Sequence, residues 1–512
     1  MFTASDLSPA DITAALARAG FEVARPQNVR RTLLDTFDGR LHAAGLRLEV
    51  REAPGVELIL AGGGRGPAHV AAADVPRLAG HLPAGPFRAR LAPVLDVRAL
   101  VPVVTVTARH TEAVQRDGAG KARATVSVYD RLEVEGRHGV ADLPAWAAEV
   151  GELAGYAKAA DGARDLLVSL GLRPGTGDVI DVVATAAGID LGGFAGSPTV
   201  ALRRDEPALG AFRRVLANLT GAVEANWRGT VDDVDPEFLH DLRVAVRRSR
   251  SVLAQGKRVL PADVRDHYRE EFSWLGSATG PARDLDVYAI EWESYVAPLG
   301  AQASAALEPV LEHIQARRKA EHAALATALR SERYRTLLAG WRTWLDDPAV
   351  NAGGGDSEGA IGQVAADRIG RAQDQLVGRG RAIEEATPAE ELHELRKDAK
   401  KLRYLLECFG GLYAPAPRKA FVQRLKALQD NLGEHQDAEV HAGQLRAISA
   451  ELYGTDGVGP HTMVAMGQLT ESLERRRQSS RDEFAQRFAA YDTKQTRRAL
   501  QEVLDSAAGP AQ

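Results

Sequence analysis

LHELRKDAKKLRYLL, residues Leu392 to Leu406, is the stretch that decides how the second half of the chain folds. Placed on a helix, its apolar positions gather on one side and its cationic positions on the other, while Glu394 and Asp398 fall outside the cationic arc. A solvated helix face usually mixes charges, because neighbouring like charges repel. A helix face of one sign therefore predicts an anionic partner. The arc consists of His393, Arg396, Lys397, Lys400, Lys401, Arg403 and Tyr404.

The same pattern occurs earlier in the chain, in HDLRVAVRRSRSVL from His240 to Leu253. Its cationic and apolar positions precede those of the second stretch by a constant 153 residues (393 minus 240), and the match continues without a gap to Val287 and Val440. We interpret this as an internal duplication. It predicts two four-helix bundles related by a pseudo-twofold axis. The first cationic arc consists of His240, Arg243, Arg247, Arg248 and Arg250.

Composition limits the class of protein. The 512 residues predict two or three domains, and 45% hydrophobic with 26% charged residues is ordinary for a globular protein. One cysteine, Cys408, excludes an internal disulfide framework and is typical of a buried side chain in a reducing cytoplasm. We see no signal peptide and no apolar run long enough to span a membrane. Because the net charge is −5, the basic arcs are local features of a mildly acidic chain.

The first two hundred residues have a different periodicity. Residues 6–19 predict a helix, after which alternation over 46–51, 104–109 and 123–137 predicts antiparallel strands with one wet face. On the last of these strands, the alternation places Tyr129, Glu133 and Glu135 on the same face. Two further stretches have helical spacing, namely 21–31 and 142–171.

The stretch LLDTFDGRLHAAGLRLEVRE, Leu33 to Glu52, resembles the CYTH domain, also called the triphosphate tunnel metalloenzyme fold. That resemblance implies an antiparallel β-barrel that holds triphosphate with Arg and Lys and a divalent cation with Glu. The matching positions are Asp35, Thr36, Leu41, Ala44, Gly45, Arg47 and Arg51.

The departures from the CYTH pattern predict that this domain is inactive. The family's opening ExExK strand is absent, and Glu49 stands where the family usually has Arg. Tunnel catalysis needs clustered carboxylates to hold the cation. The alternative is a metal-dependent triphosphatase or polyphosphatase, with Mg²⁺ or Mn²⁺ held by Glu133 and Glu135 and with the helical half gathering substrate.

The two duplicated stretches, with ARDLDV (Ala282–Val287) and HQDAEV (His435–Val440), resemble the CHAD domain, a helical domain often found behind CYTH. The resemblance implies binding of inorganic polyphosphate. We therefore expect an α+β chain: a degenerate CYTH-like domain over 1–191, a linker over 192–207 and a CHAD domain over 208–506. Within the last, we expect repeats over about 208–345 and 360–506, separated by a loop over 346–359.

Inorganic polyphosphate suits the basic arcs chemically, because it is a flexible chain of charges with no bases to read. We expect no cofactor and no membrane as partner. Nucleic acid is not expected either, since few aromatic side chains interleave with the cations. Cytoplasm, including polyphosphate granules, is the expected location. For His240 and His393, a phosphate contact and a structural hydrogen bond remain equal alternatives. Asp284, Asp286, Asp437 and Glu439 are expected to cap or pair with the Arg-rich helices rather than bind metal. The predicted site comprises His240, Arg243, Arg247, Arg248, Arg250, Arg283, His393, Arg396, Lys397, Lys400, Lys401, Arg403, Tyr404, Arg424 and Lys426.

Overall fold

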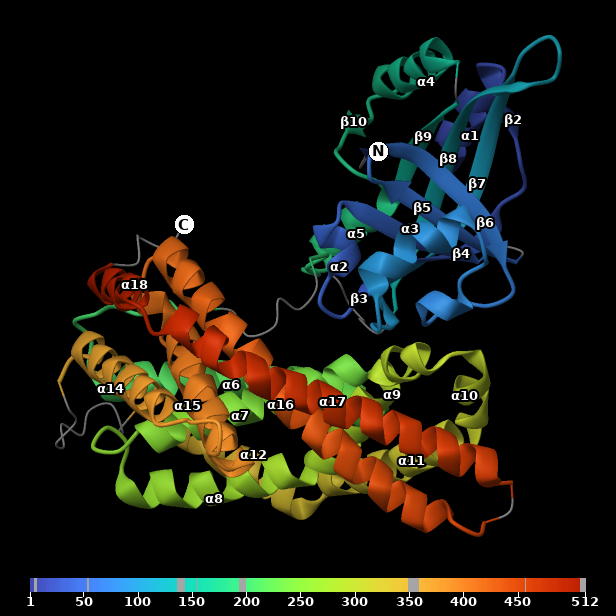
Figure 1. Ribbon diagram of the computed structural model, residues 1–512. Helices are drawn as coiled ribbons and strands as arrows, with labels where there is room; N and C mark the ends of the chain where they lie inside the picture. The colour runs from blue at the N-terminus through green and yellow to red at the C-terminus, as the bar shows by residue number, and fades with distance from the viewer. Residues whose placement is uncertain are drawn as a thin grey trace. The chain divides into compact units, whose positions relative to one another are not determined.

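A computed structural model divides the chain into two compact units, Met1–Gly196 and Ser197–Gln512 (Figure 1). The structure describes residues 1–3, 7–52, 55–135, 143–153, 155–192, 199–348, 359–455 and 457–506. Most of the expected loop over 346–359, and residues 193–198 of the expected linker, lie outside the described residues.

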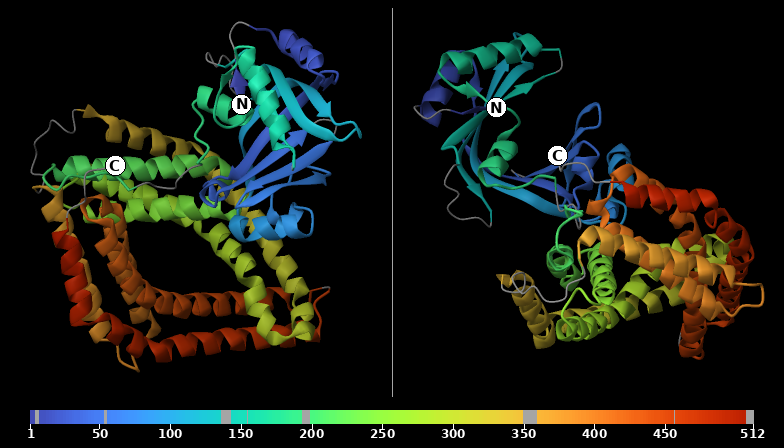
Figure 2. Two further views of the ribbon diagram at one scale, coloured as in Figure 1. Left: turned by 90° about the horizontal axis from the view of Figure 1, so that it is seen from above. Right: turned by 90° about the vertical axis from the view of Figure 1, so that its left-hand side faces the viewer.

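The N-terminal unit is built on one antiparallel sheet. The strands are β1 (Phe2–Thr3), β2 (Glu22–Val23), β3 (Gln27–Thr36), β4 (Leu46–Glu52), β5 (Val56–Gly62), β6 (Arg65–Ala72), β7 (Leu100–Arg116), β8 (Ala122–Val134), β9 (Trp146–Glu152) and β10 (Arg173–Pro174). Their order is β10-β1-β9-β8-β7-β3-β4-β5-β6, with β2 paired to β7. Figure 2 shows the sheet from two further sides.

The sheet is not closed, so the expected barrel was wrong in that respect. One edge strand, β10, has only two residues, and the other, β6, contains Pro67, which has no amide hydrogen to donate. The sheet nevertheless curls. Arg31 of β3 reaches Glu149 of β9 at 3.1 Å, although β7 and β8 lie between the two strands.

Short helices cover both faces of this sheet. One face packs its leucines against α2 (Arg40–Ala43) and α3 (Pro86–Leu95). The other packs against α5 (Val179–Ala186), while α4 (Ala157–Ser169) and α1 (Pro9–Arg18) share a further core cluster. The predicted first helix is confirmed, with Ser8 as its N-cap and Asp11 completing a capping box.

Two stretches with helical spacing contain strands, so the helix prediction was wrong for 21–31 and for the first part of 142–171, and right where α4 forms. Residues 21–31 hold β2 and the first half of β3, and residues 142–171 hold β9 before α4. Every residue of β9 pairs with β8, and Trp146, Ala147 and Ala148 are consecutively buried. Tertiary pairing therefore outweighed the local periodicity.

A β-bulge exchanges the two faces of β8. The register of β8 against β7 shifts by one residue between the pairs Arg109–Asp130 and Thr107–Glu133. Within this shift, Arg131 has a φ of 52°, in the left-handed region. Val134, after the bulge, packs in the same core cluster as Tyr129, before it. The prediction that Glu133 and Glu135 share the face of Tyr129 was therefore wrong, because alternation does not reveal an inserted residue.

The second unit is helical, as predicted from residue 206 onward. Its helices are α6 (Ala208–Val231), α7 (Pro236–Gln255), α8 (Ala262–Ala278), α9 (Gly280–Val296), α10 (Ala301–Ala306), α11 (Glu308–Arg330), α12 (Glu332–Asp346), α14 (Ile361–Arg381), α15 (Ala389–Cys408), α16 (Pro415–Leu452), α17 (Pro460–Tyr491) and α18 (Lys494–Asp505). Figure 1 and Figure 2 show α16 and α17 as a long hairpin. In the part of the chain that the structure describes, no helix is long and apolar enough to cross a membrane.

The helix bounds repeat at the spacing seen in the sequence. Helices α6 and α7 begin at residues 208 and 236, and α14 and α15 begin at 361 and 389, each 153 positions later. Helices α8 and α9 occupy the place of the single helix α16, and Pro281 in the first turn of α9 accounts for the interruption. The pseudo-twofold arrangement of two bundles stays a prediction.

Candidate polyanion-binding site

Helices α7 and α15 pack against each other and bury their apolar sides as the sequence predicts. Leu242 on α7 and Leu395 and Leu402 on α15 are fully buried. Asp235 caps the N-terminus of α7 by accepting hydrogen bonds from two amides of its first turn. With these faces fixed in the core, the cationic sides of both helices turn toward shared pockets.

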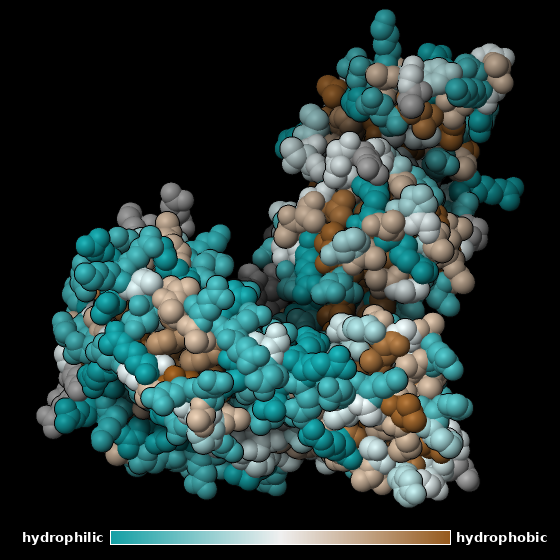
Figure 3. Space-filling view, viewed as in Figure 1, coloured by the Kyte–Doolittle hydropathy of each residue, from teal (hydrophilic) through white to brown (hydrophobic). Residues whose placement is uncertain are grey.

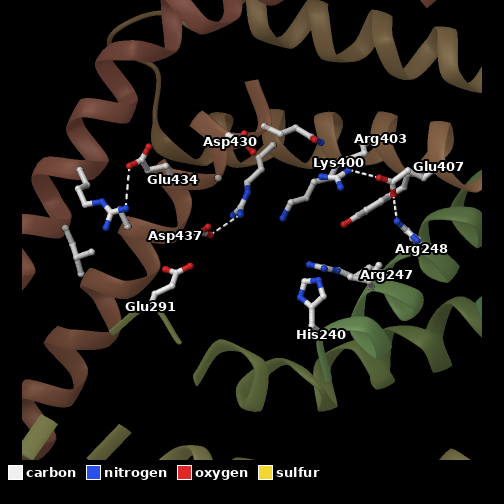
Figure 4. A pocket seen from close by; sticks show the side chains of 18 of the residues that line it. His240, Arg247, Arg248, Glu291, Lys400, Arg403, Glu407, Asp430, Glu434 and Asp437 are labelled. Carbon is white, nitrogen blue, oxygen red and sulfur yellow. Dashed lines mark hydrogen bonds and ion pairs between the residues drawn. The ribbon is translucent and has the colours of Figure 1, made fainter. Parts of the chain in front are cut away.

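The first pocket has a volume of about 490 Å³ and takes cations from both helices. Figure 4 shows Arg247 of α7 and Lys400 of α15 directed into it. Helices α9, α16 and α17 supply the opposite side, including Glu291, Glu434 and Arg476. The predicted site residues that line this pocket are His240, Arg247, Arg248, Arg396, Lys400, Arg403 and Tyr404.

The second pocket, of about 750 Å³, adjoins the first because Arg247, Lys400 and Tyr404 line both. It lies between α7, α8 and α15. The two pockets therefore lie side by side along the paired helices. The predicted site residues in the second pocket are Arg247, Arg250, Lys397, Lys400, Lys401 and Tyr404.

The two pockets differ in charge. Six cationic side chains and five carboxylates line the first, so its charges nearly cancel. Six cationic side chains and only two carboxylates, Asp266 and Glu270, line the second. The second pocket therefore offers the stronger attraction to a polyanion, while the first offers more enclosed contacts.

Lys400 and Arg247 are the cations with the least compensation. Among the described residues, neither side chain has a hydrogen-bond or ion-pair partner, and the Nε of Arg247 is buried. Burial, with Arg396 and Arg247 nearby, lowers the pKa of Lys400 to about 8. A buried donor without an acceptor is costly, so Arg247 is prepared for an anion, and the half-buried ammonium of Lys400 adds a second charge without a carboxylate partner.

Glu407 joins the two helices and was missed by the sequence prediction. It accepts from Arg248 of α7 at 2.5 Å and from Arg403 of α15 at 2.7 Å. The pair with Arg403 has the i, i+4 spacing that a helix favours, so the sequence contains that half of the contact. The bond to Arg248 crosses between helices and has no sequence signal. Arg248 and Arg403 are thus already engaged before any ligand binds.

Three predicted site residues support the helices rather than line either pocket. Arg243 donates to the Gly276 carbonyl and the Thr279 hydroxyl, and burial lowers its pKa to about 10. Arg283 donates to the Pro236 carbonyl and to His240 Nδ1. His393 Nδ1 forms a hydrogen bond with the side-chain oxygen of Gln436.

His240 makes the structural hydrogen bond that was one of its two expected roles, and its phosphate contact stays a prediction. Because a guanidinium only donates, Nδ1 of His240 accepts from Arg283 at 2.9 Å, and the ring also lines the first pocket. A neutral His240 therefore holds its proton on Nε2. For His393 only the structural hydrogen bond is present among the described residues, and it lines neither pocket.

The remaining predicted cations lie on α16, away from both linings. Lys426 pairs with Asp430 at 2.8 Å on the exposed surface of that helix. Arg424 is half-buried.

Figure 3 shows that the visible face of the helical unit is largely hydrophilic around scattered apolar side chains.

The acidic residues behave in different ways. Asp437 pairs with Arg396 at 2.9 Å, which agrees with its expected role. Asp286 instead pairs with Arg318 and His322 of α11, away from the cationic arcs. Among the residues that the structure describes, no group of three or more His, Cys, Asp or Glu side chains is arranged to hold a metal ion.

The arginines of the N-terminal unit are neutralised internally. Arg31, only 3% exposed, donates both to Glu49 at 2.7 and 2.8 Å and to Glu149. Arg47 pairs with Asp178 and Asp181 at the start of α5. These carboxylates take the guanidinium contacts that a phosphate would need.

Glu133 and Glu135, the metal ligands in the alternative hypothesis, lie on the other face of the sheet. Glu135 forms a two-point contact with Arg30, which neighbours Arg31 on β3 and so points the opposite way. Glu133 lines a separate surface pocket near Arg30 and Arg109. A cation held there would be apart from Arg31 and Arg47.

Comparison with known proteins identifies a family for part of the helical unit. Residues 214–446 match the family model of the CHAD domain. The helical unit contains a CHAD domain. Two solved structures are similar: the crystal structure of the CHAD domain from the plant Ricinus communis (26% identity, 60% of this chain and 96% of that one, TM-score 0.46) and PptA from Streptomyces chartreusis (17% identity, 56% and 100%, TM-score 0.44).

Two curated relatives are uncharacterized proteins of Mycobacterium tuberculosis, from strains CDC 1551 / Oshkosh and ATCC 25618 / H37Rv. Each is 26% identical over 224 residues, which is 43% of this chain. The match spans 42% of the relatives' own length, so it concerns less than half of each protein.

Proposed function

We propose that this protein binds inorganic polyphosphate through the paired basic helices α7 and α15 of its CHAD domain. The observation that supports this most directly is the convergence of Arg247 and Lys400, from different helices, on pockets that both side chains line. Neither has a carboxylate partner among the described residues, so an anion would supply what they lack. The resemblance to CHAD domains implies the same ligand.

The shape and charge of the surface favour a chain rather than a compact anion. Six cations line the second pocket, and the first pocket adjoins it at Arg247, Lys400 and Tyr404. Charge-assisted hydrogen bonds contribute about 1.5–3 kcal/mol each when desolvated. Several such contacts along one chain give tight binding that weakens steeply with salt.

The alternative, a metal-dependent triphosphatase in the N-terminal unit, has less support. Its carboxylates Glu133 and Glu135 lie on the face of the sheet opposite Arg31. On the face of Arg31, Arg31 and Arg47 are already paired with Glu49, Glu149, Asp178 and Asp181. Release of phosphate from triphosphate with Mg²⁺ or Mn²⁺, abolished by Glu133→Gln or Glu135→Gln, would establish the alternative.

Charge reversal on α15 tests the proposal. We expect the triple variant Arg396→Glu, Lys400→Glu, Arg403→Glu to bind long-chain polyphosphate more than tenfold more weakly, because three attractive contacts become repulsive. Equilibrium binding at fixed ionic strength measures this, and circular dichroism checks that α15 still folds. Reversal of Arg228, Arg475 and Arg487, which are exposed cations on α6 and α17, is the control and should change affinity little.

Competition separates polyphosphate from nucleic acid. At matched salt, long-chain polyphosphate should displace bound single-stranded DNA, whereas an excess of DNA should displace little polyphosphate. The basis is that, among the described residues, the linings of the two pockets contain only two tyrosines, Tyr295 and Tyr404, and the Tyr295 ring already lies under Arg476, so base stacking adds little. Stronger binding of DNA would assign the surface to nucleic acid instead.

A further inference from the structure

A third pocket adjoins the first on the other side of the pair between Arg248 and Glu407. It has a volume of about 210 Å³, and Arg248 and Glu407 line both cavities. Arg418 from the first turns of α16 lines only this smaller one, which we call the rear pocket. Thr199, from the segment before α6, and Cys408 lie in its wall.

The rear pocket contains guanidinium donors without acceptors. The Nε atoms of both Arg248 and Arg418 are buried, and neither has a hydrogen-bond partner among the described residues. Buried donors of this kind are rare and each requires an explanation, because an unmade hydrogen bond costs about 1–3 kcal/mol. A bound anion would supply acceptor oxygens to the two guanidinium groups that line the pocket.

The charge of the rear pocket is positive. Glu407 is its one carboxylate, and both oxygens of that carboxylate are already engaged, one with Arg248 and one with Arg403. Burial raises the pKa of Cys408 to about 12, so the thiol stays neutral and adds no negative charge. The guanidinium of Arg418 therefore has no local counter-charge.

The main chain makes room for that guanidinium. A Cβ on Gly410 would fall 2.4 Å from Nη1 of Arg418, so only glycine lets the side chain lie against the backbone there. Similarly, a Cβ on Gly411 would fall 1.9 Å from the carbonyl oxygen of Val200, the residue after Thr199. Gly411 therefore lets this part of the pocket wall pack closely. The contact at Gly410 places the Arg418 guanidinium against the backbone.

We propose that the rear pocket binds a single phosphate group between Arg248 and Arg418. This site is separate from the long-chain surface, the name we give to the linings of the first and second pockets. Two planar guanidinium forks match tetrahedral oxyanions. The volume is below the range of about 300–1,000 Å³ typical of pockets for drug-sized ligands, which limits the occupant to a small ion or an end group. Free phosphate and the terminal phosphate of a polyphosphate chain present the same chemistry.

Inorganic phosphate is the probe for the test, titrated into the full chain at constant ionic strength with chloride. We expect saturable binding, weakened more than tenfold in Arg418→Gln. Gly410→Ala should weaken it as well, since its methyl group displaces the guanidinium without changing any charge. Lys419→Gln removes an exposed charge from the next position of α16 and should leave phosphate affinity unchanged.

Each outcome decides the proposal. Absence of saturable phosphate binding by the wild-type chain, or equal binding by wild type, Arg418→Gln and Gly410→Ala, would overturn it. Loss of phosphate binding in Lys400→Gln but not in Arg418→Gln would also overturn it, by placing phosphate in the first pocket. If the proposal holds, displacement of bound phosphate by long-chain polyphosphate identifies the chain end as occupant, and retention identifies free phosphate. Long-chain affinity tests the long-chain surface independently.

Discussion

Lys400 lies among cations in the first pocket, half-buried and without a carboxylate partner in the described part of the chain. Its position is unfavourable for folding, because a charged ammonium loses water and faces Arg396 and Arg247. A binding surface for a polyanion tolerates that cost, since the ligand supplies the missing counter-charge. Stability and binding should therefore respond to Lys400 in opposite directions.

Replacing Lys400 by Met should raise the free energy of unfolding at pH 7 by about 1–3 kcal/mol while weakening polyphosphate binding. Between about pH 8 and pH 10.5, Lys400 is mostly deprotonated in the folded chain, where its pKa is lowered, but still protonated in the unfolded chain. Wild-type stability should therefore rise relative to Lys400→Met over that window. Urea titrations at pH 7, 8.5 and 10 measure both effects.

Lys397→Met is the control for this substitution, because Lys397 is largely exposed and pairs with Glu394 at 2.7 Å. It should change stability by a few tenths of a kcal/mol. A Lys400→Met variant that is less stable than wild type at pH 7 would contradict the assigned environment of Lys400.

Arg31 illustrates the opposite situation, a buried cation that is fully compensated. It is 3% exposed and Glu49 is 5% exposed, so removing one partner leaves the other charged in the core. We expect Arg31→Met to destabilise the N-terminal unit by about 3–5 kcal/mol. The double variant Arg31→Met, Glu49→Leu should recover a large part of the loss in calorimetry. A change below about 1 kcal/mol in the single variant would argue against the buried pair.

At the scale of elements, α7 and α15 form one binding surface because their apolar faces fix both helices in the core. Their periodicity predicts the helices, the buried leucines and the direction of the cationic arcs. Periodicity does not reveal which cations are already paired, since Glu407 meets Arg248 only after the helices pack. For the same reason it does not separate Arg243 and Arg283, which support neighbouring helices, from Arg247 and Lys400.

Glu407→Gln tests this pairing. It releases Arg248 and Arg403 from their carboxylate and so adds positive charge to the first pocket. We expect polyphosphate affinity at low salt to rise severalfold, while the free energy of unfolding falls by about 1–3 kcal/mol. Binding and urea unfolding of the same preparation measure both. Glu471→Gln, at an exposed pair with Arg475 on α17, should change neither. Weaker binding in Glu407→Gln would show that Glu407 positions the arginines for the ligand.

The sheet was harder to predict than the helices. Alternation indicates β4, β7 and β8, but β9 and the start of β3 have helical spacing and are strands through pairing with β8 and β7. The bulge at Arg131 then reverses the faces of β8, which moves Glu133 away from the face of Tyr129, where alternation placed it. Strand pairing and bulges depend on distant residues, so local pattern contains little of this information.

At the scale of the whole molecule, the two units differ in how far their cationic side chains are paired with carboxylates. The N-terminal unit pairs its buried arginines with its own carboxylates, and Asp178 and Asp181 of α5 complete that compensation. The helical unit leaves Arg247 and Lys400 uncompensated on a surface with further cations. Under our proposal, long-chain binding belongs to the CHAD domain alone, and substitutions at Arg31 or Arg47 should affect stability without affecting polyphosphate affinity.

The central claim is that α7 and α15 bind one polyphosphate chain jointly, and the salt dependence of affinity tests it most directly. We compare the full chain with Arg247→Gln, Lys400→Gln and the double variant over a range of chloride concentrations. Each single substitution should lower the slope of log affinity against log salt by about one, and the double variant by about two, with affinity falling at least tenfold in the double. An unchanged slope and affinity in either single variant would contradict a site shared by the two helices.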